Sequence, residues 1–295
     1  MPKVSVVMTL FNSEPFIGAA IGSVLGQTYS DYEIVVVDDG STDGSAAIVK
    51  SFGERVRYVH QPNRGCAHAT NHGVALSSGE YVAFLENDDV WLPQKLERQV
   101  AVLDLTPDVG AVNCDLQYVT EEGVIEEDWI QGRVPHDPYS RVFLKGFNFM
   151  LSALMLRRTA FEKTGGFFEG FRAAGLQDVE WYARLMDITT AHHIPEALAL
   201  FRRHGHRIAS KTRVRNEDIL LERLLIRFRQ DSRKRRYILS RRVAFLSNQG
   251  KAQIDKGRIE EGRKELRAAV RLGLGARVGA KMVVRSLLRL ARSVG

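Results

Sequence analysis

The chain has 295 residues, of which 44% are hydrophobic and 26% charged, the balance of an ordinary soluble globular protein. Its two cysteines, Cys66 and Cys114, are too few for a disulfide framework or a thiolate metal cluster. No apolar run is long enough to span a bilayer, and the start MPKVSVVMTL lacks the regions of a secretory signal. We therefore expect a cytoplasmic protein, with a peripheral position on the cytosolic membrane face as an alternative.

The net charge of +7 combines two opposite regions. Residues 1–201 carry a net charge of −12, whereas residues 202–295 carry +19. An acidic region suits a site that binds a cation, and a basic region suits anions such as phosphates, lipid surfaces or nucleic acid. We expect one domain over residues 1–215 and a basic helical region over residues 216–295.

Buried-strand patterns alternate with helical spacing in the first part of the chain. Strands are predicted over Val4–Leu10, Glu33–Val37, Val56–Val59 and Tyr81–Leu85, and helices over Phe16–Leu25, Ser45–Phe52 and Thr70–Ser77. This order is typical of an α/β fold with a mostly parallel central sheet. Ligands of such sheets bind beyond the carboxyl ends of the strands.

The later elements are less regular. We predict a helix over Gln94–Leu105, a strand over Val109–Asn113, a hairpin or edge strand over Gln117–Val124, a loop over 126–140, and helices over Gln177–Met186, Gln249–Leu272 and Lys281–Leu290. The segment from Gln249 also has the small-residue and charge spacing of a helical hairpin.

Two polar motifs follow predicted strands. Glu86-Asn87-Asp88-Asp89 follows one, and its carboxylates can hold Mg²⁺ or Mn²⁺ against a phosphate; the alternative is a solvated acidic turn. Asp38-Asp39-Gly40-Ser41-Thr42-Asp43 follows another, and its carboxylates can accept hydrogen bonds from a base or ribose; the alternative is a helix-capping turn. Glycine-rich dinucleotide and P-loop motifs are missing from the sequence.

The motifs VSVVMTLFN, EIVVVDDGSTD, GEYVAFLENDDVW, TGGFFEGF, QDVEWYAR and FRRHGH occur in this order. Together they resemble the family-2 inverting glycosyltransferases of GT-A fold, over about residues 3–206. The resemblance implies a Rossmann-like nucleotide-diphospho-sugar transferase domain, a UDP-sugar donor, a divalent cation, and a glycan, lipid-linked or cell-surface polysaccharide acceptor.

The resemblance also implies roles for individual residues. The nucleotide would be held by Thr9, Phe11, Asn12, Asp39, Arg64 and Asn87, and the metal by Glu86, Asp88 and His204. Asp178 would be the general base, and Gly166 and Phe167 would shape the acceptor side. The sequence departs from the family pattern at Glu86, where Asp is usual, and at Gln177, where an acid is common.

The basic region admits three interpretations: packing on the acidic domain or oligomerisation, binding to anionic membrane, and binding to nucleic acid, for which no reading motif is present. For the whole chain, the alternatives to glycosyl transfer are a nucleotidyltransferase that makes nucleotide sugars and a degenerate domain that only binds. A nucleotidyltransferase usually has a glycine-rich basic loop after the first strand, and LFNSEPF is not such a loop. The presence of Asp88 and Asp178 argues against a degenerate domain.

Overall fold

The computed structural model describes residues 1–129, 150–171, 176–203 and 210–292. They form two compact units, one up to Asn216 and one from Glu217 onward. Within the described helices, none is long and apolar enough to cross a membrane.

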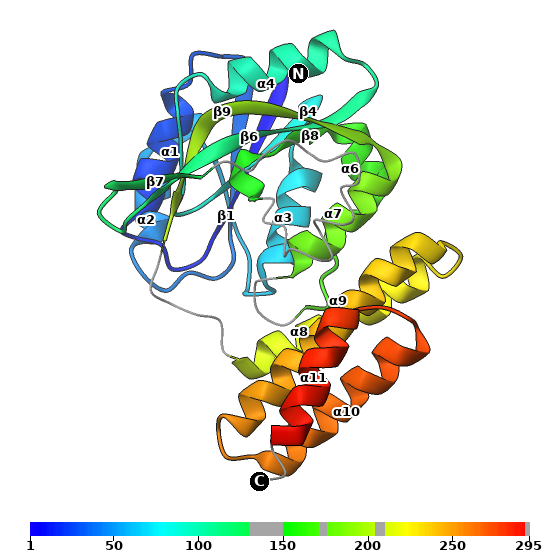
Figure 1. The fold of residues 1–295 in the computed structure, drawn as a ribbon. Helices are drawn as coiled ribbons and strands as arrows, with labels where there is room; N and C mark the ends of the chain where they lie inside the picture. The colour runs from blue at the N-terminus through cyan, green and yellow to red at the C-terminus, as the bar shows by residue number, and fades with distance from the viewer. Residues whose placement is uncertain (130–149, 172–175, 204–209, 293–295) are drawn as a thin grey trace. The chain divides into compact units, whose positions relative to one another are not determined.

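The first unit is built on one mixed sheet (Figure 1). Its described strands lie in the order β3-β2-β1-β4-β8-β6-β9-β5, and β7 pairs with β6. The strands are β1 Val4–Leu10, β2 Tyr32–Asp38, β3 Arg57–His60, β4 Tyr81–Glu86, β5 Val90–Trp91, β6 Val109–Val119, β7 Ile125–Trp129, β8 Met155–Arg157 and β9 Thr190–Arg202. Neighbours within β3-β2-β1-β4 are parallel, as are β6 and β9, whereas β8 runs antiparallel to β4 and β6. The predicted mostly parallel α/β sheet is confirmed.

Helices cover both faces of this sheet (Figure 1). They are α1 Ile17–Leu25, α2 Ser45–Ser51, α3 Cys66–Leu76, α4 Lys95–Leu105, α6 Arg158–Thr164 and α7 Gln177–Ile188. Buried side chains of α1 and α4 join one core cluster with Val4, Val6 and Met8 of β1. Because alternate strand residues point to opposite faces, Val7 and Thr9 lie on the other face, where a Cβ on Gly73 of α3 would press on Val7.

The same alternation places two polar residues beside each other. Thr9 of β1 is the register partner of Glu86 of β4, and Val7 is the partner of Phe84. Phe84 packs edge-on against Phe167 and against Trp181 of α7. Thr9 and Glu86 therefore point to the α3 and α7 side of the sheet, at the carboxyl ends of their strands.

Two predicted boundaries differ from the structure. Strand β6 continues to Val119 and makes a hairpin with β7. Residues 126–129 of the predicted loop therefore belong to a strand, and its remainder lies outside the described residues. The predicted helix Gln249–Leu272 is two helices, α9 Ser232–Ile254 and α10 Ile259–Gly275. They are separated at Gly257, which has a φ of 76° that favours glycine.

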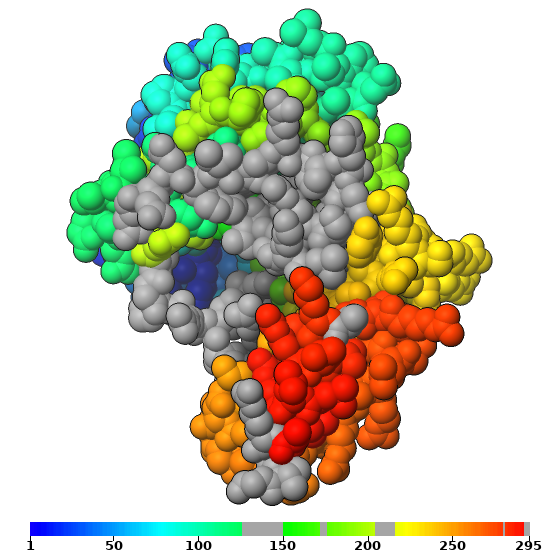
Figure 2. Space-filling view, viewed as in Figure 1, coloured from blue at the N-terminus to red at the C-terminus, as the bar shows by residue number. Residues whose placement is uncertain are grey.

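The second unit is helical and holds most of α8 Ser210–Arg227, together with α9, α10 and α11 Ala280–Arg292. Helices α9 and α10 approach closely at Gly250, where a Cβ would lie 2.8 Å from the carbonyl oxygen of Gly262. A small core of Val243, Ala269, Val278 and Val283 joins α9, α10 and α11. Figure 2 shows α11, in red, at the surface of this unit.

Candidate functional site

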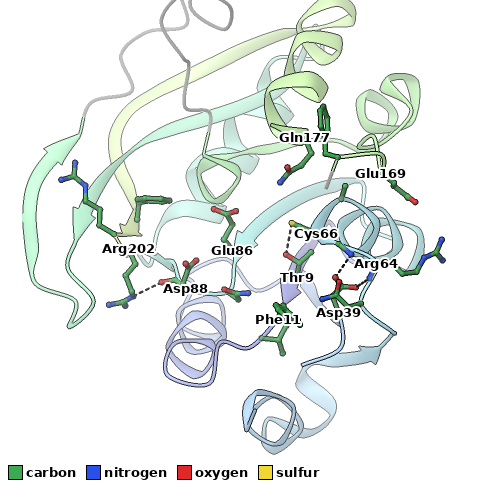
Figure 3. Close-up of a pocket in the computed structure, with 18 residues that line it drawn as sticks. Thr9, Phe11, Asp39, Arg64, Cys66, Glu86, Asp88, Glu169, Gln177 and Arg202 are labelled. Atoms are coloured by element: carbon green, nitrogen blue, oxygen red, sulfur yellow. Dashed lines mark hydrogen bonds between the residues drawn. The ribbon is translucent and has the colours of Figure 1, made fainter. Parts of the chain in front are cut away.

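A pocket of about 730 Å³ opens in the first unit at the carboxyl ends of β1, β2 and β4. Its lining is drawn in Figure 3 and consists of Thr9, Leu10, Phe11, Asp39, Asn63, Arg64, Gly65, Cys66, Ala67, Glu86, Asn87, Asp88, Glu169, Phe171, Gln177, Phe201, Arg202 and Arg203. Thr9 lies between the acids Glu86 and Asp88 on one side and Asp39 on the other (Figure 3). The pocket thus brings both sequence motifs together.

Asp39 organises one wall of the pocket. Its carboxylate accepts the backbone N–H of Arg64 and of Gly65, each at 2.8 Å, and an N–H of the Gln61 amide at 2.8 Å. Gly65 has a φ of 91° and immediately precedes α3. The carboxylate therefore fixes the turn that leads from the exposed Arg64 into α3, and one acceptor position remains, on Oδ2 of this pocket residue.

Phe11 and Asn12 both follow β1, but only Phe11 lines the pocket. Phe11 is 49% exposed and lines the pocket, so its ring is available for stacking on a planar group. Asn12 adopts a left-handed φ of 47° and joins two loops, accepting the Thr42 N–H at 2.8 Å and donating its own N–H to Ser41. Asn12 is outside the pocket lining.

The acid motif ends β4 and turns into β5. Glu86, Asn87 and Asp88 line the pocket, whereas Asp89 is 1% exposed and turned into the protein. Asp89 accepts hydrogen bonds from the Ser152 hydroxyl and from the backbone N–H of Arg202. The motif thus divides into two pocket carboxylates and one that anchors the loop.

Arg202, at the end of β9, holds this loop from the other side. Its Nε donates to the Asp88 carbonyl at 3.0 Å, and its terminal nitrogen donates to the carbonyls of Thr120 and Glu121. The guanidinium also lies over the Phe16 ring, 5.0 Å from its centroid. These contacts connect the acid loop with the β6–β7 turn.

The opposite rim carries Glu169, Phe171 and Gln177. Gly166 and Phe167, expected on the acceptor side, lie behind this rim: the Phe167 N–H donates to Asn71 Oδ1 at 2.8 Å, and its ring stacks on Trp181. Asn71 also donates to Glu169 Oε1 at 2.9 Å. Gly166 and Phe167 therefore support the rim from below and are not part of its surface.

Asp178 occupies the first turn of α7, directly after the pocket residue Gln177. One carboxylate oxygen accepts the N–H of Val179 at 2.8 Å. Its charge contributes to the raised pKa of Glu86. Asp178 is thus in the electrostatic neighbourhood of the acid motif, although its side chain does not line the pocket.

The carboxyl groups repel one another in the absence of a cation. Burial raises the pKa of Glu86 well above its usual value, and the charges of Asp89, Asp88 and Asp178 add to the effect. Burial also raises the pKa of the Cys66 thiol to about 11, so this pocket thiol is neutral at pH 7 and a poor nucleophile.

The donor set fits a divalent ion that shares its shell with a ligand. Glu86 and Asp88 offer hard oxygens to the same pocket, and Mg²⁺ or Mn²⁺ is held by one or two carboxylates plus substrate phosphates. Among the described residues, no three His, Cys, Asp or Glu side chains are grouped to hold a metal by themselves. The third expected ligand, His204, lies outside the described residues.

Several lining residues were not predicted from the sequence. Cys66, Glu169, Phe171, Gln177 and Arg202 come from segments far apart along the chain. Four of them had a signal, since Glu169 and Phe171 stand in TGGFFEGF, Gln177 in QDVEWYAR and Arg202 in FRRHGH. Only the fold shows that they line the pocket and that the Arg202 guanidinium reaches the acid loop.

The chain belongs to glycosyl transferase family 2, whose family model matches residues 5–165. The putative glycosyltransferase EpsE of Bacillus subtilis is 29% identical over 63% of this chain and 67% of its own length. Uncharacterized glycosyltransferases of Nostoc and Rickettsia felis are 38% and 27% identical over 55% and 74% of this chain, which covers 52% and 37% of those relatives. The chain is thus similar to proteins named as glycosyltransferases over 37–67% of their length.

Solved structures share the fold. TarS of S. aureus, residues 1–349 in complex with UDP-GlcNAc, matches 99% of this chain and 87% of its own with a TM-score of 0.71 and 18% identity. The mannosyltransferase PcManGT of Pyrobaculum calidifontis, in complex with GDP-Man and Mn²⁺, matches 98% of this chain and 87% of its own with a TM-score of 0.57 and 20% identity. The GT-A fold expected from the sequence is confirmed.

Proposed function

We propose that this enzyme transfers a sugar from a nucleotide-diphosphate donor, a UDP-sugar, to a hydroxyl group in one displacement that inverts the anomeric carbon. The observation that carries the proposal is the single pocket that holds Thr9, Phe11 and Asp39 beside Glu86 and Asp88. Such a pocket combines an aromatic and polar wall for a nucleoside with an acidic wall for a phosphate-bound cation. It matches the donor chemistry of a transferase.

The nucleoside would lie along the Asp39 wall. Phe11 would stack on the base, and the acceptor position that remains on Asp39 Oδ2 would accept an N–H or a hydroxyl. UDP is proposed as the nucleotide because the TarS structure, the stronger of the two fold matches, contains UDP-GlcNAc. Arg64 and Arg203 line the same pocket and would neutralise diphosphate charge.

The acid wall would hold the cation. Glu86 and Asp88 would bind Mg²⁺ or Mn²⁺ together with the diphosphate, and His204 would complete the shell. When bound, the ion stabilises the charge that develops on the diphosphate leaving group. Arg202 keeps the Asp88 backbone in place for this task through its 3.0 Å hydrogen bond to the Asp88 carbonyl.

Asp178 would accept the proton of the acceptor hydroxyl as the new bond forms. A hydroxyl is a poor nucleophile, and a positioned carboxylate removes its proton in the transition state. The neutral Cys66 thiol is a poor nucleophile, so no covalent intermediate on this residue is proposed. Glu169 and Phe171 would border the acceptor.

The proposal also covers the acceptor of the sugar and the cellular location of the reaction. We propose a glycan, lipid-linked or cell-surface polysaccharide acceptor, reached from the cytoplasm and, for a lipid-linked one, at the membrane surface. Residues 1–215 would carry the transfer reaction and residues 216–295 would form a basic helical domain.

A panel of nucleotide sugars tests the proposal. UDP-sugars with Mn²⁺ should raise the melting temperature by several degrees, whereas the same sugars with a chelator should not, because ligand bound only by the folded state stabilises it. Slow donor hydrolysis should accompany binding. Asp88→Asn should remove the Mn²⁺-dependent part of the shift. If no nucleotide sugar stabilises the protein or is hydrolysed, the proposal fails.

A further inference from the structure

The helical unit contains an open pocket of about 670 Å³ between two of its turns. One wall comes from the α8–α9 turn and the first residues of α9, and the other from the α10–α11 turn. Four arginines line it: Arg229, Arg235, Arg236 and Arg277. All its lining residues belong to the second unit.

The pocket concentrates positive charge. No Asp or Glu is among its lining residues. Within the described part of the chain, none of the four guanidinium groups is paired with a carboxylate, unlike Arg241 and Arg242 farther along α9, which pair with Glu217 and Asp218. Four like charges around one opening raise the free energy of the unit unless an anion binds there.

Few of the guanidinium N–H groups in this pocket bond to other described residues of the chain. Arg236 donates to the carbonyl of Arg277 at 3.5 Å, and Arg235 donates to the carbonyl of Leu225 at 3.5 Å. Both hydrogen bonds are at the long limit, and each guanidinium has five N–H donors. Most donors in this pocket are therefore available to a ligand.

Arg277 follows the end of α10. Its φ of 53° is the left-handed conformation that is common just after a helix. The Arg277 N–H donates to the Leu274 carbonyl at 3.2 Å, and the Val278 N–H donates to the Gly273 carbonyl at 3.0 Å. The helix end therefore accounts for this backbone, and the side chain that it carries lines the pocket.

The N-terminus of α9 contributes little to the attraction of an anion to this pocket. Asp231 caps this helix by accepting the N–H of Lys234 at 2.9 Å, and its carboxylate also lies 3.4 Å from the Lys234 ammonium. An acid at this position offsets the positive end of the helix dipole. The affinity of the pocket for an anion therefore comes from the arginines and not from the helix end.

We propose that this pocket binds a phosphate group, either of a free phosphate ester or of a lipid headgroup. Arginine suits phosphate because its planar fork donates two parallel hydrogen bonds to two oxygens. Leu239, Ala276 and Val278 supply an apolar wall for the carbon part of the ligand. The inference is independent of the transfer reaction, because it concerns a different pocket in the other unit.

The test compares two double variants of the full chain. Arg236→Gln with Arg277→Gln removes two pocket cations; Arg229 and Arg235 are left alone because they also line a neighbouring pocket with Asp218 and Glu222. Lys264→Gln with Arg267→Gln removes two exposed cations from the middle of α10 and is the charge-matched control. Circular dichroism confirms that both variants fold.

Binding is measured with chelator and without nucleotide sugar, so that the catalytic reaction plays no part. One arm titrates pyrophosphate at constant ionic strength by calorimetry. The other measures sedimentation with phosphatidylcholine vesicles, with and without phosphatidic acid. Loss of two charge-assisted contacts should weaken binding at least about tenfold in the pocket variant, and the control should bind like the wild type.

The two arms identify the source of the phosphate. Variant-sensitive binding to pyrophosphate alone indicates a free phosphate ester, and variant-sensitive binding to phosphatidic acid vesicles indicates a lipid headgroup. Either result supports the site. The proposal is overturned if the wild type binds neither probe, or if the pocket variant and the control bind both probes equally.

Discussion

Asp89 and Arg202 are 113 residues apart in the chain, yet the carboxylate of Asp89 accepts the backbone N–H of Arg202 at 3.0 Å. The side chain of Arg202 bonds to the same loop: its Nε donates to the backbone carbonyl of Asp88, the residue before Asp89, at 3.0 Å. Asp89 also accepts the Ser152 hydroxyl. One buried acid and one arginine thus fix the backbone of the residue proposed to bind the cation.

Arg202→Gln should therefore destabilise the protein and impair the site. The change leaves the carbonyls of Asp88, Thr120 and Glu121 without their charged donor, which should cost about 2–4 kcal/mol of unfolding free energy. Urea unfolding measures this loss. Arg55→Gln is the control: Arg55 is exposed, lies over the Phe52 ring and is outside the pocket lining, so its loss should cost less than about 1 kcal/mol. Equal effects of the two changes would contradict the clamp.

Asp178→Asn tests the proposed base. The amide cannot accept a proton, so kcat should fall by about 10²–10⁴-fold, while donor affinity stays close to that of the wild type. Asp187→Asn makes the same charge change at the exposed end of the same helix and should leave kcat unchanged. Steady-state kinetics with donor binding measured separately distinguishes the two effects. Full turnover by Asp178→Asn would exclude it as the base.

Lys95 gives the first unit a specific pH dependence. Its ammonium is fully buried, donates to Gln99 Oε1 at 2.7 Å and lies over the Trp91 ring. Burial lowers the pKa of Lys95 from 10.5 to about 8. Between these values the unfolded chain binds a proton that the folded chain has lost, so stability should rise with pH across this window, by about 3 kcal/mol in total.

Lys95→Met should remove this rise. At pH 7 the variant loses a desolvated charge but leaves Gln99 Oε1 without its donor, so its net stability should change by less than about 2 kcal/mol. Unfolding free energies at pH 7, 8, 9 and 10 measure the slope. Lys50→Met, at an exposed position on α2, should retain the wild-type slope. A slope unchanged in Lys95→Met would show that Lys95 does not cause it.

Strands β1, β2 and β4 could be predicted because each contains a short buried apolar run followed by polar residues. The register of Thr9 opposite Glu86 follows from parallel pairing of two such runs. The sequence predicts a hairpin or edge strand over Gln117–Val124 but not strand β7, because Glu126, Glu127 and Asp128 are typical of a loop and only pairing with β6 makes them a strand.

The site, too, could be predicted from the sequence only in part. Asp39, Glu86 and Asp88 stand at strand ends, where the fold class places ligands. Arg202 and Glu169 stand in the quoted motifs FRRHGH and TGGFFEGF, but they reach the pocket through tertiary contacts that these motifs do not specify. Asn12 follows a strand equally closely, but its side chain joins the 41–42 turn because its left-handed backbone directs it there.

Two glycines of the first unit should respond oppositely to alanine. A Cβ on Gly73 of α3 would lie 2.5 Å from Val7 Cγ1 and 3.3 Å from Val37 Cγ2, both in the buried sheet, so Gly73→Ala should cost about 1–3 kcal/mol. A Cβ on Gly22 of α1 would meet nothing within 4 Å, so Gly22→Ala should stabilise by about 0.5–1 kcal/mol. Urea unfolding measures both. Because α3 carries Cys66 and the Asp39-bound turn, displacing it at Gly73 should also weaken nucleotide binding, whereas Gly22→Ala should leave binding intact. A stable Gly73→Ala variant with unaltered binding would contradict the close packing of α3 on β1 and β2.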